Sequence, residues 1–294
     1  MVDLHIHTNS SDGDHDITTV LKMLNTLEVK VASITDHDSI GAYDQMKNIE
    51  VKKYFKGKII TGCEFKCSFE GVSIEVLGYG FDVNLIKKAN KSNAKKINNM
   101  QFEIFELLKK RCDKLGLKYD KNVKIENGKF AAKTMQEVLY PYIEYNKKIF
   151  DEDILKTGVN FFRKGCCNKN SPLYIDESSF LPSASEVVQI IKKAGGISFV
   201  AHPGIYVVNN NLEFLTRILD ETEVDGSECF YPFHSKQFIN DILNLCKNRK
   251  KYVSGGSDYH GEKSKPGVKI GCGNVDEDKL TWINKKYFFN DYIK

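Results

Sequence analysis

The sequence of 294 residues lacks several features that mark common protein classes. It has six prolines and one tryptophan. No apolar run approaches the roughly 20 residues of a membrane-spanning helix. Asp3 follows Met1 so closely that no signal peptide is expected, and no Gly-rich phosphate loop of the dinucleotide or P-loop kind is present. We therefore expect a soluble, cytoplasmic protein with no membrane partner.

The eight cysteines lack the spacing of common metal and disulfide motifs. None forms a C-x-x-C pair, and several lie in apolar runs where a reduced, buried thiol is ordinary. Cys63 and Cys67 flank Glu64 with a C-x-x-x-C spacing, but no second pair follows. Structural thiols are therefore favoured over a zinc pair. The adjacent Cys166 and Cys167 do not imply a functional disulfide.

The sequence does contain metal-ligand-type side chains, gathered in short phrases along the chain. Five of its seven histidines lie in them. The phrases are Asp3-Leu4-His5-Ile6-His7, Ser11-Asp12-Gly13, Thr35-Asp36-His37-Asp38, Thr61-Gly62-Cys63-Glu64, Ala201-His202-Pro203 and Gly256-Ser257-Asp258-Tyr259-His260. Side chains at positions i and i+2 of a strand point to the same side, so neighbours such as His5 and His7 can close on one ion. The pattern indicates a polynuclear metal hydrolase.

Most of these phrases follow apolar, β-branched runs that are typical of short buried parallel strands. Helical stretches lie between the runs. The expected strands cover residues 30–35, 58–61, 196–201 and 251–254, and two of the expected helices cover residues 185–193 and 236–246. Each strand delivers a ligand at or just past its C-terminal end, where α/β barrels hold their active sites. We therefore predict an α/β fold.

Positive charge gathers in the middle of the chain. The whole sequence has 43 basic and 39 acidic residues, yet residues 83–182 hold 20 basic against 12 acidic ones. Helical stretches at 94–115, 133–145 and 151–164 dominate this segment. We interpret residues 82–182 as a basic helical lid inserted between two parts, 1–81 and 183–294, of a metal-binding domain. A basic lid suits a phosphorylated substrate, although the lysines could equally solvate exposed helix faces.

In their order and spacing, the phrases resemble the polymerase and histidinol phosphatase (PHP) superfamily of phosphoesterases over residues 1–81 and 183–294. The resemblance implies a distorted (β/α)7 barrel of TIM type that holds two or three divalent ions, which are Mn²⁺, Fe²⁺ or Zn²⁺, with Mg²⁺ as an alternative. It places His5, His7, Glu64 and Asp258 on one ion and Asp12, His37 and His260 on a second. Glu64 would bridge to a third ion, which His202 also binds.

One departure from the family pattern falls at the third ion. The family usually has a histidine where Ile74-Glu75-Val76-Leu77-Gly78-Tyr79 has Glu75. A carboxylate is a harder, anionic ligand and favours manganese, magnesium or iron over zinc. Asp3, Asp36 and Asp38 are expected to orient ligands or cap turns. His15 lies outside the family pattern, and we expect it to be exposed.

The resemblance is closest to the nucleoside 3',5'-bisphosphate phosphatase branch, because histidinol phosphatases tend to have histidine where Asp12 stands. It implies hydrolysis of a phosphate monoester of a small nucleotide by a metal-bridging hydroxide. Glu64 and Asp258 would be the central catalytic groups. His234 is a candidate acid or phosphate ligand.

The branch grips its second phosphate with arginines, of which this chain has only four. Lys95, Lys96, Lys129 and Arg111 are candidate substitutes, although lysine binds phosphate as a point charge. Ser171-Pro172-Leu173-Tyr174-Ile175 resembles the family's return strand. The alternatives are a 5'-3' exonuclease on short RNA or DNA, a histidinol-phosphate-type phosphatase and a noncatalytic metal-stabilised module.

Overall fold

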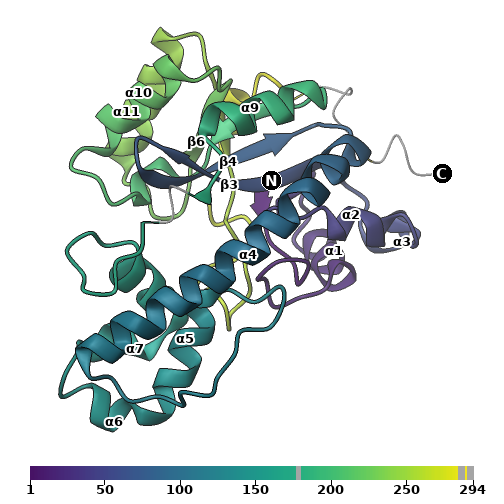
Figure 1. The fold of residues 1–294 in the computed structure, drawn as a ribbon. Helices are drawn as coiled ribbons and strands as arrows, with labels where there is room; N and C mark the ends of the chain where they lie inside the picture. The colour runs from purple at the N-terminus through teal and green to yellow at the C-terminus, as the bar shows by residue number, and fades with distance from the viewer. Residues whose placement is uncertain (177–179, 284–288, 290–294) are drawn as a thin grey trace. The chain divides into compact units, whose positions relative to one another are not determined.

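The computed structural model describes residues 1–176, 180–283 and 289, and for residues 90–98 it describes the backbone alone. The chain divides into two compact units (Figure 1). Unit 1 comprises Met1–Asn90 and Pro182–Lys294, and unit 2 comprises Lys91–Leu181. Each unit has its own cluster of buried apolar side chains.

Unit 1 is built on a seven-stranded, mostly parallel sheet whose strands lie in sequence order. The strands are β1 (Val2–Ile6), β2 (Val31–Ile34), β3 (Lys58–Phe69), β4 (Val72–Tyr79), β5 (Ile197–Val200), β6 (Gly226–Phe230) and β7 (Tyr252–Gly255). Only β4 runs antiparallel to its neighbours, β3 and β5. The predicted α/β class is confirmed.

The β3–β4 hairpin is the main difference from the expected strands. A strand was predicted over residues 58–61, but β3 continues to Phe69 and pairs with β4 from Gly62↔Tyr79 to Phe69↔Val72. Glu70 and Gly71 connect the strands, and both have positive φ, of 49° and 73°. Two positive φ values characterise a tight hairpin turn that matches strand twist.

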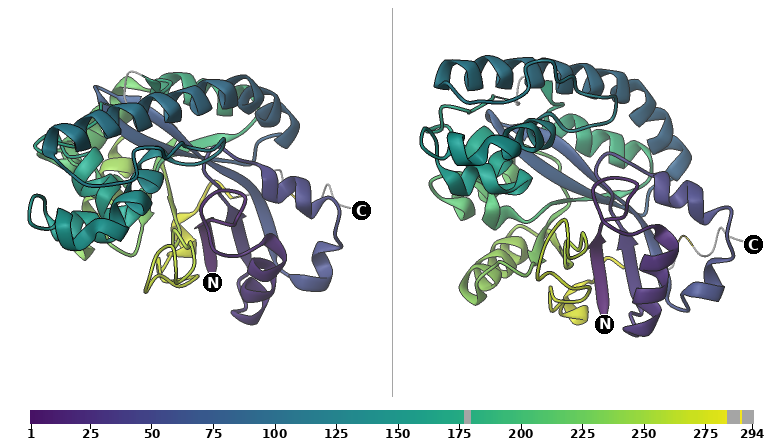
Figure 2. Two further views of the ribbon diagram at one scale, coloured as in Figure 1. Left: turned by 60° about the horizontal axis from the view of Figure 1, so that its bottom comes forward. Right: turned by 90° about the horizontal axis from the view of Figure 1, so that it is seen from below.

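The segment after β7 returns to β1. Tyr259 forms a parallel bridge with Ile6, and the amide of Asp258 donates to the carbonyl of His5 at 2.8 Å. Both views of Figure 2 show this C-terminal segment, in yellow, beside the purple β1. Gly256 allows the approach, because a Cβ there would lie 2.4 Å from the His5 nitrogen. The first and last ligand phrases are thereby brought together.

Helices of unit 1 pack on the sheet through apolar faces. They are α1 (Ile17–Thr26), α2 (Gly41–Met46), α3 (Val51–Tyr54), α9 (Ala184–Lys193), α10 (Asn211–Glu221) and α11 (Lys236–Asn248). Figure 1 shows α9 lying along β3 and β4, and a capping box of Ser183 and Glu186 begins it. The helices predicted at 185–193 and 236–246 are confirmed, with ends within two residues of those expected.

Unit 2 contains the C-terminal part of α4 (Val83–Leu115) and several short helices. These are α5 (Ala131–Leu139), α6 (Ile143–Asn146), α7 (Glu152–Lys156) and α8 (Gly158–Asn160), with a 3-10 turn at Tyr140–Tyr142 and a π-helical turn at Phe161–Cys166. The helix predicted over 133–145 is interrupted at Pro141, which cannot donate a helical hydrogen bond. The one predicted over 151–164 is interrupted at Thr157, which caps α8.

The prediction of a return strand at residues 171–175 is wrong. The segment forms turns instead, in which the amide of Tyr174 donates to the carbonyl of Ser171 at 3.0 Å. Leu173 and Ile175 are buried in the apolar cluster of unit 2. Among the helices of the described residues, none combines the length and apolar character needed to cross a bilayer.

Candidate metal centre

The strands of unit 1 bring together nine of the predicted site residues. β1 carries His5 and is followed by His7 and Asp12, while His37 follows β2. Three sets have ligand atoms within 4.8 Å of one another. They are His5, His7, Glu64 and Asp258; His7, Asp12, His37 and His260; and His37, Glu64 and Glu75. We call these residues, with His202, the ligand cluster.

Glu64 lies at the centre of the ligand cluster and is fully buried on β3. Its Oε2 lies 3.2 Å from His5 Nε2, 3.1 Å from His7 Nε2 and 3.3 Å from His37 Nδ1. Its Oε1 lies 2.9 Å from His202 Nε2. Burial opposes ionisation of Glu64, but the surrounding imidazoles outweigh it and hold the pKa of Glu64 well below its ordinary value.

Asp258 and His260 complete the cluster from the segment after β7. Asp258 Oδ1 lies 3.5 Å from His5 Nε2 and 3.4 Å from His7 Nε2. The backbone of Asp258 has φ of 55°, and that of His202 has φ of 22°. Such positive φ values are costly for residues other than glycine and concentrate at functional sites.

The second set surrounds Asp12. Its Oδ1 lies 3.3 Å from His260 Nε2 and 3.6 Å from His7 Nδ1, and its Oδ2 lies 3.7 Å from His37 Nε2. His7 stacks on His260 with ring centroids 4.0 Å apart. His7 thus faces two carboxylates of the first set and one of the second, whereas the family resemblance implied a place in the first set alone.

The third set contains Glu75, which lies on β4. Its Oε2 lies 3.4 Å from His202 Nε2, and its Oε1 lies 3.7 Å from His37 Nδ1. Glu75 therefore reaches His202, as expected, and also His37, which was expected to serve only the second ion.

The chemistry of the cluster fits bound divalent cations. Within the described part of the chain, neither ring nitrogen of the buried His7 has a hydrogen-bond partner, although Glu64, Asp258 and Asp12 surround it. Burial lowers the pKa of His7, but these carboxylates outweigh burial and raise it to about 10. The centre therefore requires positive charge, and imidazole nitrogens with carboxylate oxygens are donors that manganese, iron and zinc accept.

Glu228 supports the ligand cluster, although the sequence did not lead us to predict it as a site residue. It is fully buried on β6, where its Oε1 lies 2.9 Å from His5 Nδ1 and its Oε2 accepts the amide of His202 at 2.7 Å. The sequence feature that could have indicated this role is the position of a single glutamate within the buried run Gly226-Ser227-Glu228-Cys229-Phe230. A charged residue is rarely buried unless it is paired.

Asp3 supports the cluster, as expected, whereas Asp36, which was expected to orient His37 or cap the next turn, contacts Thr8 instead. Asp3 accepts the amides of Ser257 at 2.9 Å and Gly271 at 2.7 Å. Asp36 accepts the amide and hydroxyl of Thr8, both at 2.7 Å, and so orders the loop after β1 rather than His37.

Two further residues missed from the sequence contact Asp258. The hydroxyl of Tyr231 donates to Asp258 Oδ2 at 3.1 Å, and the ammonium of Lys265 forms an ion pair with the same oxygen. Asp258 thus directs one oxygen toward His5 and His7 and the other toward Tyr231 and Lys265. Lys265 is seven residues beyond Asp258, and no motif marked it.

The structure does not favour His234 as an acid or phosphate ligand. Its Nδ1 donates to the carbonyl of Cys229 at 2.9 Å, and its Nε2 accepts the amide of Gly204 at 3.1 Å. Both ring nitrogens are therefore engaged within the protein. His15, expected to be exposed, is half-buried, with its Nδ1 3.3 Å from the hydroxyl of Tyr259.

The predicted phosphate-binding cations lie in unit 2. Lys129 is exposed, and the guanidinium of Arg111 donates to the carbonyl of Pro172 at 3.2 Å. The side chains of Lys95 and Lys96 lie outside the described residues.

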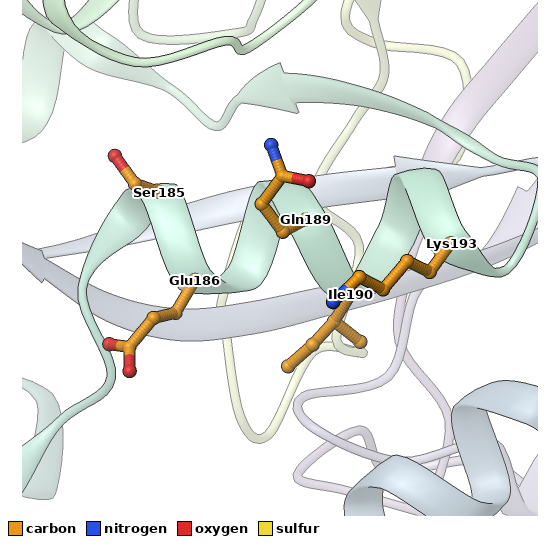
Figure 3. Close-up of a pocket in the computed structure, with 5 residues that line it drawn as sticks. All are labelled: Ser185, Glu186, Gln189, Ile190 and Lys193. Atoms are coloured by element: carbon orange, nitrogen blue, oxygen red, sulfur yellow. The ribbon is translucent and has the colours of Figure 1, made fainter.

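A surface hollow elsewhere in unit 1 is lined by none of the residues of the ligand cluster. Figure 3 shows its lining side chains projecting from the single helix α9. They are Ser185, Glu186, Gln189, Ile190 and Lys193, none of which belongs to the ligand cluster.

Solved structures with the same fold cover nearly the whole chain. A predicted metal-dependent phosphoesterase from Bifidobacterium adolescentis has a TM-score of 0.67 at 22% identity and covers 97% of this chain and 96% of its own. An amidohydrolase from Chromobacterium violaceum, with bound sulfate and no metal, has a TM-score of 0.67 at 18% identity. The match covers 91% of this chain and 90% of the amidohydrolase chain.

Three enzymes with related sequences cleave different phosphate esters. A 5'-3' exoribonuclease of Haemophilus influenzae is 24% identical over 88% of this chain and 89% of its own length. A phosphoribosyl 1,2-cyclic phosphate 1,2-diphosphodiesterase of Eggerthella lenta is 23% identical over 88% of this chain and 94% of its own length. A 3',5'-nucleoside bisphosphate phosphatase of Chromobacterium violaceum is 21% identical over 88% of this chain and 87% of its own length.

The PHP domain family matches residues 3–156, which is more than half of the chain. The match includes the first four ligand phrases, which contain His37 and Glu64, and also Glu75. The chain belongs to the PHP domain family and is a metal-dependent phosphoric ester hydrolase.

Proposed function

We propose that this enzyme hydrolyses the phosphate monoester of a small nucleotide, such as a nucleoside 3',5'-bisphosphate. The observation that carries the proposal is the position of Glu64, whose two oxygens lie within 3.3 Å of nitrogens from four histidines. A carboxylate in that position is suited to bridging cations. Bridged divalent cations are a common device for displacement at phosphorus.

The residues proposed to hold the ions come from the three sets and from His202, which lies beside Glu64 and Glu75. We propose that His5, His7, Glu64 and Asp258 hold one ion. Asp12, His37 and His260 would hold a second, and Glu64, Glu75 and His202 a third. When bound, such ions supply Lewis-acid polarisation of the phosphoryl oxygens and an activated water. The protein itself contributes fixed carboxylates, imidazole nitrogens and a buried setting that excludes bulk water.

We also propose that the strands of unit 1 form the distorted (β/α)7 barrel implied by the family resemblance. The bridge between Ile6 and Tyr259 supports it, because it joins β1 to the segment after β7. We propose that unit 2 corresponds to the inserted basic lid. Its bounds of 91–181 lie within the residues 82–182 expected for that insertion.

A nucleotide is proposed as substrate for two reasons. Residues 83–182 carry a surplus of positive charge, and such a surface attracts a substrate with a second phosphate. One related enzyme is named for nucleoside bisphosphates. A second candidate function is 5'-3' exonuclease activity on short RNA, since the related enzymes from Haemophilus influenzae, Salmonella typhimurium and Escherichia coli are named for it.

The test is a substrate panel with the manganese-loaded protein. Adenosine 3',5'-bisphosphate should release inorganic phosphate, and Asp258→Ala should abolish the release. Lys192→Met is the matched control, because Lys192 lies exposed on α9 and pairs with Glu223. Failure to release phosphate from any monoester would overturn the proposal. Progressive shortening of a 5'-phosphorylated oligonucleotide, with no release from the bisphosphate, would establish the second candidate instead.

A further inference from the structure

The loop after His260 is held firmly beside the ligand cluster. Asp14 accepts the amide of Lys263 at 2.7 Å and the hydroxyl of Ser264 at 2.7 Å. At the far end, Asp3 accepts the amide of Gly271 at 2.7 Å. Because both carboxylates follow or belong to β1, the loop is anchored to the strand that carries His5. Lys265 therefore has a fixed backbone position.

The side chain of Lys265 ends at the cluster. Its ammonium pairs with Asp258 Oδ2 and donates to the hydroxyl of Tyr231 at 3.3 Å, and the side chain is 16% exposed. The ammonium nitrogen also lies 5.4 Å from the ring centroid of Tyr231 and 5.7 Å from the ring centroid of Phe233. The ammonium is thus both anchored and reachable from solvent.

A lysine in this position does not help to retain metal ions. Its charge repels cations held by Asp258, and Tyr231 alone could orient the second carboxylate oxygen with a neutral hydrogen bond. A cation beside a metal centre instead favours an anionic ligand, and a phosphate has oxygens to share between metal ions and an ammonium. This reasoning assigns Lys265 to the substrate rather than to the ions.

Phe233 adds an aromatic surface next to this cation. Its side chain is 61% exposed, and its ring packs edge-on against Tyr231 with centroids 5.6 Å apart. A single exposed phenylalanine is ordinary on a protein surface. Here, however, the ring is fixed by Tyr231 and adjoins the ammonium of Lys265. A ligand that carries a phosphate and an aromatic ring matches both groups.

We propose that Lys265 binds the phosphate at the ligand cluster and that Phe233 stacks on the base of the nucleotide substrate. The inference rests on the proposed function and deepens it, because it assigns base recognition to a side chain of unit 1. Lys265 also takes the phosphate-binding role that His234 cannot fill while both its ring nitrogens are engaged.

The first test measures binding of inorganic phosphate to the manganese-loaded protein by calorimetry. Lys265→Met should weaken phosphate binding about tenfold, because a charge-assisted hydrogen bond to phosphate is lost. Lys265→Arg should restore most of the affinity. Phe233→Ala and the control Lys192→Met should bind phosphate as the wild type does. The manganese content of every variant, measured by elemental analysis, should be unchanged.

The second test compares KM for adenosine 3',5'-bisphosphate and ribose 5-phosphate. Phe233→Ala should raise KM for the adenosine compound about tenfold and leave KM for ribose 5-phosphate unchanged, because only the first can stack. Phe233→Trp should restore the wild-type KM. Tyr252→Ala is the aromatic control, since Tyr252 is exposed at the start of β7, away from Asp258.

Each test has outcomes that would overturn the inference, and they are of two kinds. One is wild-type phosphate affinity in Lys265→Met, or loss of manganese in parallel with loss of phosphate binding, which indicates a role in holding the metal site. The other is an equal change in KM for both esters in Phe233→Ala, or no change in either. A wild-type enzyme that releases phosphate from none of the monoesters in the substrate panel would instead overturn the proposed function, while the phosphate titration would still decide the role of Lys265.

Discussion

Glu228 holds His5 by its Nδ1 nitrogen at a distance of 2.9 Å, which leaves the Nε2 nitrogen of His5 facing Glu64. Both side chains are fully buried. The other oxygen of Glu228 accepts the amide of His202, so one carboxylate fixes ligands that follow or lie on β1 and β5. Outer carboxylates of this kind set the tautomer and raise the basicity of a ligating imidazole.

Glu228→Gln should therefore lower manganese affinity about 10- to 100-fold without unfolding the protein. The amide keeps the volume of the side chain but removes its charge. Metal titration of the purified variant measures the effect, and Glu223→Gln is the matched control because Glu223 is exposed and pairs with Lys192. Wild-type manganese affinity in Glu228→Gln would show that Glu228 does not tune His5.

Gly256 is required for the close approach of the β7 end to β1. A Cβ at this position would lie 2.4 Å from the His5 nitrogen and 2.8 Å from Asp3 Oδ1. Gly256→Ala should therefore lower the free energy of unfolding by about 1–3 kcal/mol and weaken metal binding, since Asp258 and His5 would separate. Denaturant melts measure the first effect and metal titration the second. Gly158→Ala is the control, because a Cβ there comes no closer than 3.6 Å to another atom. Equal stability of the two variants would contradict this account.

The ligand phrases could be predicted because each depends on local geometry. His5 and His7 are two residues apart at the end of β1, and His37 and His202 lie two or three residues beyond the ends of β2 and β5. Glu228 and Lys265 could not be predicted in this way. Each makes its contacts with residues from other elements, and neither lies in a recognisable spacing.

The errors have the same physical origin. His234 seemed available because sequence cannot show that Cys229 and Gly204 occupy its two ring nitrogens. The length of β3 was missed because residues 62–69 pair with β4, and that pairing depends on the turn at Glu70 and Gly71.

Metal removal should destabilise the protein. When no cation is bound, imidazoles and Lys265 are the groups among the described residues that balance the charge of the buried carboxylates of Glu64 and Asp258. Manganese at about 100 times its Kd stabilises a folded protein by about 2.7 kcal/mol, which corresponds to a Tm increase of about 5 °C or more. Thermal melts before and after chelation, with manganese added back, provide the measurement. An identical Tm in all three samples would argue against metal binding by the cluster.

Buried thiols of unit 2 should resist alkylation. Burial raises the pKa of Cys112 to about 12, so its reactive thiolate is scarce at pH 8 and increases only as the pH approaches that value. Cys167 is only half-buried. Iodoacetamide at pH 8 should therefore label Cys167 before Cys112 in the folded protein, as measured by peptide mass spectrometry. Cys167→Ser should remove the fast label from the peptides of unit 2, whereas Cys272, which is also half-buried, lies in unit 1. Rapid labelling of Cys112 under native conditions would mean that this part of unit 2 opens readily.

The departure at Glu75 provides a test of metal preference. Glu75 contributes a carboxylate 3.4 Å from His202 Nε2, where the family usually has histidine. Hard oxygen donors favour manganese or iron, whereas an added imidazole favours zinc. After the apoprotein is exposed to equal amounts of manganese and zinc, Glu75→His should retain more zinc and less manganese than the wild type. Elemental analysis measures the ratio, and Glu70→His, a change at an exposed residue paired with Arg217, is the control. If both variants retain the wild-type ratio, Glu75 does not select the metal, and the preference comes from the other residues of the ligand cluster.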